Sequence, residues 1–471
     1  MRIVLFLMIS FLSSTLLFAL QPISSKIVSK EQYKVYRKHK GKVTHKKGEY
    51  TIISLFSNDN EIEWAKMFDM VEMGGVDDMN IKKNTLKNKQ LLSINRRIGY
   101  NWMPAFYYYT KSKNRDFVDW VYNNRQRTTL NPNGPFLHCK KNGYDWCRDY
   151  YYNYGDKELF KKRVEDLIYD MRSKGFNALF FDWASGSFLL SKEYAKMRKN
   201  FQKLNPNKNY FELIGNFYKT LKNNGVFIVT NQAFRKEKYL LKYVNYDMTE
   251  SYTTTDTTKK IKIQIAGVGW RDSIKTTNYY PIYKNSKTIK DSLHFMDILD
   301  SYKKKYKKYG FKNFIYMNYI APRYKRVYES FPLYKEVKPK NAIYYSYATA
   351  KLSNNLVYAE IPENRALERD EIYFYDLGKP LGKKYKKLDA INAYVRFFSN
   401  GFVLSSEAYS KTKYIKIDSR YIPANRYIYD AYDNVWMKSN NHSLVIKISY
   451  IKDEFTKKSL PAGRVFLYQK D

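Results

Sequence analysis

The sequence predicts an α/β fold: a (β/α)8 TIM barrel over residues 50–383, followed by a small antiparallel all-β domain over 384–471. Three observations predict it. Short apolar runs alternate with longer amphipathic stretches from residue 50 onward, a glycine ends several of these stretches, and after about Leu381 only short β runs follow. With 471 residues, 44% of them hydrophobic, the chain can bury one large core or two smaller ones, which excludes intrinsic disorder.

Residues 1–20 have the pattern of a signal peptide. A single early cation, Arg2, precedes the apolar run 3–20, and polar residues follow from Gln21. An uncleaved anchor is the alternative, because the run is at the lower limit for spanning a bilayer. We therefore expect an exported protein that is periplasmic, secreted or anchored at its N-terminus to the outer side of the membrane. The Lys-rich segment 21–49 is predicted to be a basic linker or arm.

Eight apolar runs are predicted as the strands of the barrel: 50–57, 67–74, 98–109, 178–182, 226–231, 244–250, 313–319 and 356–361. Helical patterns at 156–173, 209–223 and 288–308 end before Gly175, Gly225 and Gly310, where a left-handed cap is needed. Repeated strand, helix and glycine imply right-handed crossovers and a parallel sheet. An open doubly wound sheet is the alternative, but no glycine-rich phosphate fingerprint follows the first strand.

The two cysteines of the chain, Cys139 and Cys147, flank a turn-forming stretch around Asn142-Gly143. In an oxidising compartment this spacing favours a local disulfide that staples a loop. A zinc site would need more ligands, and the five histidines are scattered along the sequence. We therefore predict neither a metal site nor a cofactor.

The C-terminal region, 384–471, has the spacing of a β-sandwich-like domain. Two β runs meet at Ser399-Asn400-Gly401, a strong signal for a tight hairpin, and further runs follow at 414–417, 443–450 and 465–469.

The formal net charge of +39 has two interpretations. An excess of Lys over Arg, together with abundant Asn, Ile, Phe and 48 Tyr, is typical of the codon usage of an AT-rich genome. The alternative is a polyanionic partner. Export and the absence of Walker, zinc-finger or RNA-binding motifs argue against nucleic acid. An acidic polysaccharide, or peripheral association with an anionic envelope, remains compatible with the charge.

Carboxylates end two of the predicted strands. Asp182 ends the run 176–182, and Glu250 ends 243–250. In a (β/α)8 barrel the reacting groups lie at the C-terminal ends of the strands, and hydrolysis of a glycosidic bond needs two carboxyl groups. By our count these are strands four and six, so both groups are expected to face one cavity. Taken singly, each is equally a helix N-cap or a loop residue.

An amide and several aromatic residues accompany this pair. Asn231 ends the fifth strand, where it is either a hydrogen-bond partner of a sugar or carboxylate or a turn-forming residue. Aromatic rings at strand ends suit a saccharide cleft, because sugar rings present apolar C–H faces. The predicted substrate-binding residues are Asn231, Trp102, Trp183, Tyr252 and Tyr319.

The order of these strand-end motifs, Phe180-Phe181-Asp182, Thr230-Asn231-Gln232 and Thr249-Glu250-Ser251, resembles that of secreted TIM-barrel glycosidases, including the endo-α-1,4-polygalactosaminidase group. The segments 346–352, 375–381 and 395–403 are similar to the hypothetical glycosyl-hydrolase-like family 15, in which an Arg-x-Phe-x-Asn-Gly-type hairpin opens the C-terminal β domain. The resemblance implies a glycoside hydrolase with Asp182 and Glu250 as the matching carboxylates. It departs from the pattern at Ala184-Ser185-Gly186, where a second acidic residue is expected.

The sequence therefore predicts a glycoside hydrolase that cleaves an extracellular or envelope polysaccharide or oligosaccharide by a two-carboxylate mechanism. Asp182 is expected as nucleophile or base and Glu250 as general acid, although the roles can be exchanged, and retention and inversion both stay open. The alternative is a catalytically inactive glycan-binding or envelope protein on the same scaffold, favoured by the missing acidic residue.

Overall fold

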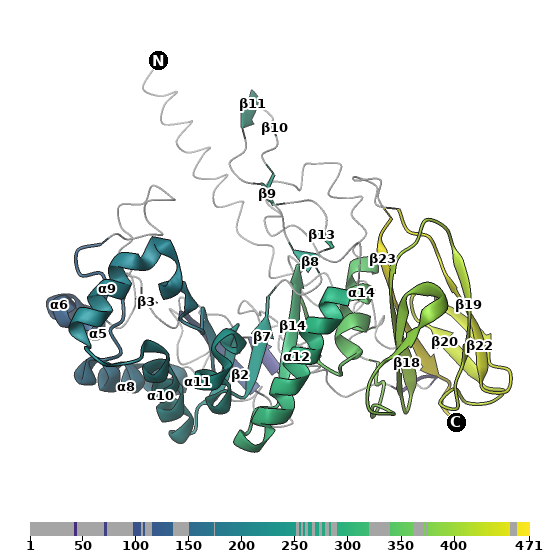
Figure 1. The fold of residues 1–471 in the computed structure, drawn as a ribbon, viewed down its shortest axis with the longest axis horizontal. Coiled ribbons are helices and arrows are strands. Elements are labelled where there is room, and N and C mark those ends of the chain that lie inside the picture. Colours follow the sequence, from purple (N-terminus) through teal and green to yellow (C-terminus); the bar gives the residue numbers. More distant parts are fainter. Residues whose placement is uncertain are drawn as a thin grey trace, which may run out of the picture.

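The computed structural model describes residues 42–44, 70–72, 98–104, 107–108, 115–134, 150–173, 175–250, 290–319, 340–360, 372, 375–452 and 459–471, with six short strand pieces between 254 and 283. A seven-stranded sheet forms its first half (Figure 1). Its strands, in order across the sheet, are β1 (Met70–Glu72), β2 (Ile98–Pro104), β5 (Ala178–Asp182), β6 (Phe227–Asn231), β7 (Tyr246–Thr249), β14 (Asn313–Tyr319) and β15 (Leu356–Glu360).

Every pairing in this sheet is parallel, and the spatial order is the order in the chain. A parallel sheet with sequential strand order is what the sequence predicts. Seven of the eight predicted strands are present. The first, 50–57, lies outside the described residues.

The predicted strand 98–109 is partly wrong. It leaves the parallel sheet at Pro104, and β3 (Tyr107–Tyr108) pairs antiparallel with β4 (Tyr150–Tyr151). Proline at position 104 lacks the N–H that a further ladder bond would need.

A second feature absent from the prediction follows β7 directly. Three antiparallel pairs are nested in one excursion of the chain that leads away from the sheet: β8 (Thr254–Thr255) with β13 (Ile282–Tyr283), β9 (Thr258–Lys259) with β12 (Thr276–Thr277), and β10 (Lys262–Ile265) with β11 (Gly269–Asp272).

The three predicted helices are confirmed as α8 (Lys157–Ser173), α10 (Tyr210–Asn223) and α12 (Lys290–Tyr306), the last continued by η6 (Lys307–Tyr309). Gly175, Gly225 and Gly310 follow them with φ of 77°, 79° and 88°. In each case the glycine N–H and the next N–H bond back to the helix, so the chain turns into the following strand within three residues.

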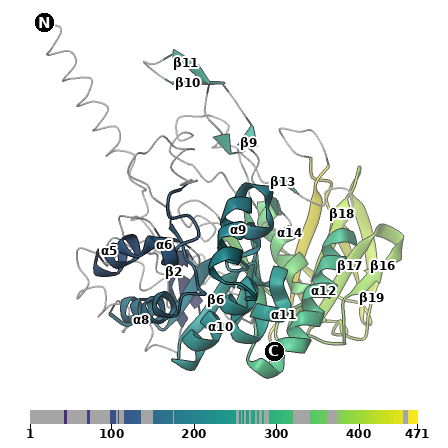
Figure 2. The same cartoon turned by 60° about the vertical axis from the view of Figure 1, so that its left-hand side comes forward.

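Further helices are α5 (Arg115–Asn123), α6 (Arg125–Thr128), α9 (Ala195–Leu204), α11 (Glu237–Leu240) and α14 (Lys340–Lys351). Short 3-10 turns adjoin them at η2 (Ser187–Leu190), η3 (Lys192–Tyr194), η4 (Ala233–Lys236) and η5 (Leu241–Tyr243). Figure 2 shows α8, α10 and α11 in front of β6.

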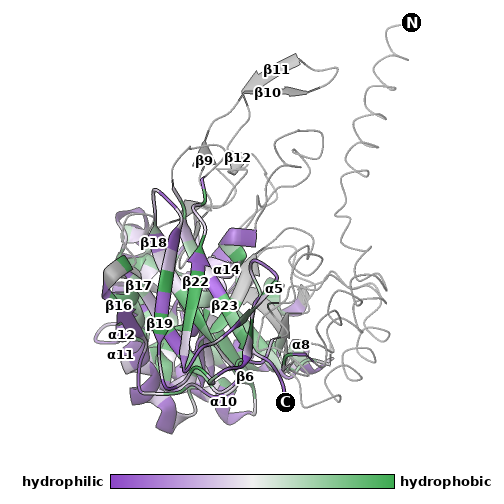
Figure 3. Cartoon of the chain, turned by 90° about the vertical axis from the view of Figure 1, so that its right-hand side faces the viewer, coloured by the Kyte–Doolittle hydropathy of each residue, from purple (hydrophilic) through white to green (hydrophobic). Residues whose placement is uncertain are grey.

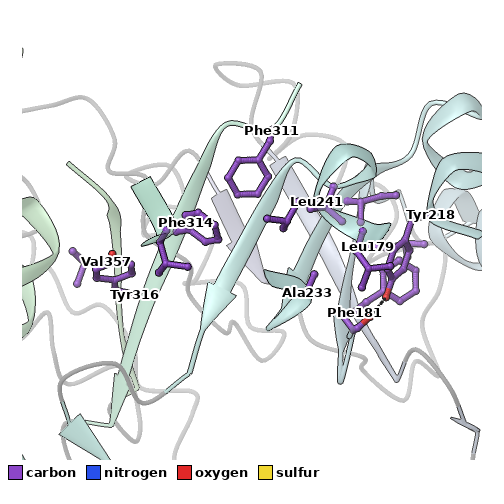
Figure 4. Close-up of a cluster of buried hydrophobic side chains, with 14 of the residues drawn as sticks. Leu179, Phe181, Tyr218, Ala233, Leu241, Phe311, Phe314, Tyr316 and Val357 are labelled. Atoms are coloured by element: carbon purple, nitrogen blue, oxygen red, sulfur yellow. Dashed lines mark hydrogen bonds between the residues drawn. The ribbon is translucent and has the colours of Figure 1, made fainter. Parts of the chain in front are cut away.

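The two faces of the parallel sheet have separate cores. Leu179, Phe181 and Tyr316 join the large cluster that includes the helices (Figure 4). Alternate residues, among them Phe180 and Met248, form a smaller cluster on the other face, hereafter the inner face. Because side chains alternate along a strand, this division fixes the direction in which each strand-end residue points.

The C-terminal part is an antiparallel sheet ordered β16 (Lys386–Leu388), β17 (Ala393–Phe398), β18 (Gly401–Ala408), β23 (Pro461–Tyr468), β20 (Tyr427–Asp430) and β21 (Val435–Lys438). The hairpin predicted at Ser399-Asn400-Gly401 joins β17 to β18. The pair β19 (Lys413–Asp418) and β22 (Ser443–Ile448) covers one face through a shared apolar cluster (Figure 3). The sequence missed β20 and β21, which are only four residues long.

Helix α14 packs against β18 and β23 on the opposite face of that sheet. Residues 341–351 of the helix are all buried, and the side chains of Tyr344, Val403 and Val465 belong to the same cluster as the helix-facing core of the parallel sheet. One continuous core thus joins the two parts of the chain.

Residues 42–44 belong to the segment predicted as a linker or arm. Val43 is buried, and the Thr44 carbonyl accepts a hydrogen bond from the Asp376 N–H. Within the described residues, no helix is both long and apolar enough to cross a membrane. The predicted signal peptide, 1–20, lies outside them.

Candidate active site

Three polar residues end neighbouring strands and point to the inner face. Asp182 is the last residue of β5, Asn231 is the last residue of β6, and Glu250 directly follows β7. Each stands two positions after a residue of the inner-face cluster, namely Phe180, Val229 and Met248. With a side-chain period of two, all three side chains lie at the same edge and on the same face of the sheet.

The amide of Asn231 joins the two carboxylates. Its Nδ2 donates to Asp182 Oδ1 at 2.9 Å and to Glu250 Oε2 at 3.0 Å. These two oxygens are therefore within about 6 Å of each other, which is inside the range of carboxylate pairs that act on one bond. The side chain of Asn231 is 5% exposed, whereas Asp182 and Glu250 are partly open to solvent. The reverse orientation of the amide would direct its oxygen at two carboxylates, so the donor role is fixed by charge.

A tight turn follows Asp182. Trp183 has φ of 55°, and its N–H donates to Asp182 Oδ1 at 2.9 Å. The next N–H, that of Ala184, donates to the Asn231 carbonyl at 3.2 Å, and the Ala184 carbonyl accepts a bond of 3.1 Å from Tyr218 Oη. Tyr218 is a fully buried residue of α10 (Figure 4). Two N–H groups on Asp182 Oδ1 stabilise its ionised form.

A similar turn follows Asn231. Gln232 has φ of 64°, and its N–H donates to the Met248 carbonyl at 2.9 Å. Asp247, on the helix-facing side of β7, accepts hydrogen bonds from Ala233 N–H at 2.9 Å and Phe234 N–H at 2.8 Å. Burial raises the pKa of Asp247 to about 7, although its hydrogen bonds act in the opposite direction.

Sequence reasoning missed Asp247 and Tyr218. A signal for Asp247 was present, because an acidic residue in the middle of the apolar run Tyr246-Asp247-Met248 must find buried donors. Tyr218 carried no such signal among 48 tyrosines.

Of the predicted aromatic residues, Trp183 has a described side chain next to the carboxylates. It is 36% exposed, and its ring lies 6.0 Å from that of Phe188. Phe188 in turn packs on Tyr151 and Tyr194, at 5.2 Å and 4.9 Å. A partly open indole on a rigid aromatic base is suited to stack against an apolar ring face.

The side chains of the other predicted site residues lie outside the described part of the chain. Trp102 lies within β2, and Tyr319 is the last residue of β14, but their side chains lie outside the description. Tyr252, Cys139 and Cys147 are outside it entirely, so the disulfide stays a prediction. Among the described residues, no group of three or more His, Cys, Asp or Glu side chains could hold a metal ion.

No family model and no curated protein matches the chain. The solved structures similar to it include glycoside hydrolases. The glycoside hydrolase domain of PelA from Pseudomonas aeruginosa is 11% identical, over 68% of this chain and 97% of that one, with a TM-score of 0.38. An Anoxybacillus alpha-amylase is 8% identical, over 88% and 90%, with a TM-score of 0.43. Trehalose-6-phosphate hydrolase from Bacillus licheniformis is 10% identical, over 90% and 99%, also with a TM-score of 0.43.

Proposed function

We propose that the protein is a glycoside hydrolase in which Asp182 and Glu250 cleave a glycosidic bond. The observation that carries this proposal is the shared bond donor: one amide nitrogen, Asn231 Nδ2, binds both carboxylates. A purely structural role for Asp182 or Glu250 does not require two like charges at one edge of the sheet, where they repel each other. A two-carboxylate mechanism does require it.

The proposed mechanism is retaining. Carboxyl groups about 5 to 5.5 Å apart support a covalent intermediate, whereas inversion needs about 6.5 to 9.5 Å to admit a water. The common donor Asn231 Nδ2 keeps one pair of their oxygens within about 6 Å, below the lower limit of the inverting range, which supports retention.

The two roles follow from the donors around each group. Asp182 Oδ1 accepts from both Trp183 N–H and Asn231 Nδ2, which favours a charged nucleophile. Glu250 accepts from Asn231 at Oε2 and is assigned as the acid that protonates the leaving oxygen and then as the base that activates water.

The remaining sequence expectations belong to the proposal. The sequential all-parallel strand order and the separate inner-face cluster support a closed barrel, for which the sequence predicts a further strand at 50–57, outside the described residues. The motif resemblance supports membership of the glycosyl-hydrolase-like family 15, near the polygalactosaminidase group. The apolar run 3–20 supports export, and the net charge of +39 supports an acidic polysaccharide as substrate.

The glycan-binding alternative has one observation in its favour. The turn after Asp182 is closed by Gly186 N–H bonding to the Trp183 carbonyl, and Ser185 and Ser187 bond to each other. Residues 184–187 therefore supply hydroxyl groups where a second acid is expected. In the proposed enzyme, the Asn231 amide takes the place of this second acid, because it binds and orients the carboxylates of Asp182 and Glu250.

A release assay on a panel of acidic and neutral exopolysaccharides tests the proposal. We expect wild type to release reducing ends and Asp182→Asn and Glu250→Gln to lose at least about 1000-fold in kcat. In Asp182→Gly, added azide is expected to restore turnover and yield a glycosyl azide of inverted anomeric configuration. Binding by wild type without release of any reducing end would establish the glycan-binding alternative. Hydrolysis retained in both variants would overturn the assigned residues.

A further inference from the structure

Asp247 is a buried acid outside the bridged carboxylate pair. Its side chain is 0% exposed and points to the helix-facing side of β7, opposite to Tyr246 and Met248 of the inner-face cluster. It therefore has no access to a substrate on the inner face. Burying a carboxyl group is costly, so its retention in the middle of an apolar strand calls for a specific set of donors.

Those donors lie on both sides of Asn231. Thr230 Oγ1 donates to Asp247 Oδ1 at 2.8 Å, from the residue before Asn231. Ala233 N–H and Phe234 N–H donate to Oδ1 and Oδ2, from the residues after it. One carboxylate thus holds the strand end, the left-handed Gln232 and the start of η4 together.

Asp247 also belongs to β7, which leads directly into Glu250, three residues after Asp247. The bonds of Asp247 therefore set β6 relative to β7 at the level of the site. Gln232 N–H, bonded to the Met248 carbonyl, reinforces the same register. A shift of this turn would move the Asn231 amide away from one of the two carboxylates.

We propose that Asp247 is a positioning residue of the candidate site. Its carboxylate directs the Asn231 amide at Asp182 and Glu250 by fixing the chain on both sides of Asn231. The effect on catalysis rests on the proposed function, whereas the effect on the Asn231 geometry does not.

The charge state of Asp247 matters because a protonated carboxyl has fewer acceptor positions than a carboxylate. The pKa of Asp247, raised by burial to about 7, supports a titration near neutrality. From α10, Tyr218 faces it as a phenol that stays protonated, since burial and the neighbouring charges, that of Asp247 included, raise the pKa of Tyr218 well above its usual value. From β6 and η4 the facing donors are Thr230 and the two backbone N–H groups, none of which titrates.

The test compares Asp247→Asn with Asp430→Asn. Asn has nearly the same volume as Asp, but an NH2 group replaces one carboxylate oxygen. That NH2 group would face a backbone N–H, so two donors would meet and the hydrogen bond would be lost. Asp430 is a matched control, because it too is buried and accepts from two backbone N–H groups, Tyr432 at 2.9 Å and Asp433 at 3.2 Å, in the C-terminal sheet. The milder variant Thr230→Val removes one donor to Asp247. It allows the proposal to be tested if Asp247→Asn fails to fold.

Crystal structures and kinetics of the purified full chain give separate readouts. We expect Asp247→Asn, or Thr230→Val in its place, to break at least one of the two Asn231 bonds and to lower kcat about 10- to 100-fold with KM nearly unchanged. We expect the acid limb of the wild-type kcat profile near pH 7 to be lost. Asp430→Asn should keep both Asn231 bonds and full kcat.

Both Asn231 bonds intact in Asp247→Asn, with kcat within about twofold of wild type, would overturn the proposal. If wild type hydrolyses no glycan, the proposed function fails, and the crystal structures alone decide whether Asp247 positions Asn231.

Discussion

Trp183 and Gln232 have the same left-handed backbone, with φ of 55° and 64°, and each directly follows a polar residue of the site. Both turns are tied to the next strand, through Ala184 N–H to the Asn231 carbonyl and Gln232 N–H to the Met248 carbonyl. The repeated turn keeps Asp182 and Asn231 on the inner face while the backbone leaves the sheet. Two non-glycine residues at positive φ, a conformation that costs energy, thus adjoin the candidate site.

The left-handed turn at Gln232 predicts a specific response to substitution. Gln232→Gly is expected to change the free energy of unfolding by less than about 1 kcal/mol, because relief of strain offsets the greater entropy of the unfolded glycine. Gln232→Val is expected to lose about 1 to 3 kcal/mol, since a β-branched residue tolerates positive φ poorly. Urea unfolding measures both. Asn207→Val, at φ of 65° on an exposed turn, is the control. It should lose a similar amount of stability and keep its full activity.

The bridging amide predicts the effect of a third carboxylate. Asn231→Asp keeps the shape but removes the donor between Asp182 and Glu250, so three acidic groups meet at one edge of the sheet. We expect a marked loss of thermal stability at pH 7 that is largely recovered at pH 5, because protonation relieves the repulsion. Differential scanning calorimetry at the two pH values checks this. Asn216→Asp, exposed on α10, should lack the recovery, and the same curve for both variants would contradict the bridge.

How far the sequence predicts this molecule depends on the range of each signal. The strand ends at Asp182, Asn231 and Glu250 were predictable, because alternation and position along a strand are local properties. The glycine caps at Gly175, Gly225 and Gly310 were predictable for the same reason. The bond from Tyr218 to Ala184 depends on the approach of α10 to the turn after β5, and the donors to Asp247 depend on the pairing of β6 with β7; no spacing in the sequence encodes either.

The two buried acids predict the pH dependence of stability. Burial raises the pKa of Asp247 to about 7 and that of Asp430 to about 6, from an ordinary value of 3.8. Each group is more readily protonated in the folded chain, so its contribution to stability is complete below about pH 4 and is lost as the pH rises through the folded pKa. The free energy of unfolding due to these groups should therefore fall between about pH 4 and 7.

Chemical denaturation at half-unit pH steps isolates that contribution. Asp430→Asn should flatten the plot of unfolding free energy against pH mainly below pH 6. Asp247→Asn should flatten the same plot up to pH 7. The two effects should add, because the residues lie in different sheets with separate donors. An unchanged slope in either variant would contradict the assigned protonation of that group.

The partly exposed Trp183 predicts a loss of glycan affinity without a loss of fold. In Trp183→Ala, the stacking surface over Phe188 is removed, and we expect KM or Kd for a bound oligosaccharide to rise about 10-fold or more. The change in melting temperature should be small. Tyr169→Ala is the control, since Tyr169 is 72% exposed on α8 and should leave affinity unchanged. Isothermal titration calorimetry distinguishes the two variants, and equal affinities would exclude Trp183 from the binding surface.

The union of the two parts of the chain depends on one close approach between α14 and β23. A Cβ added at Gly463 would stand 2.3 Å from the Tyr344 carbonyl oxygen and 2.4 Å from Tyr345 Cα. Both are backbone atoms of a buried helix, so neither can rotate away. The helix must therefore move as a unit, which strains the core it shares with the parallel sheet.

Gly463→Ala is accordingly expected to lower the free energy of unfolding by about 2 kcal/mol or more, although alanine is otherwise favoured over glycine in a strand. Because α14 also packs against β15, the loss should appear in the unfolding of both parts of the chain, as a single transition at lower temperature. Calorimetry combined with limited proteolysis checks this. Gly382→Ala gives the contrast: its added Cβ would meet only the Tyr421 side chain, with Oη at 3.5 Å, so its cost comes from the backbone φ of 72° and it should leave the α14–β23 contact intact. A transition that splits in two in Gly463→Ala would mean that the parallel sheet and the C-terminal sheet fold independently, despite their common core.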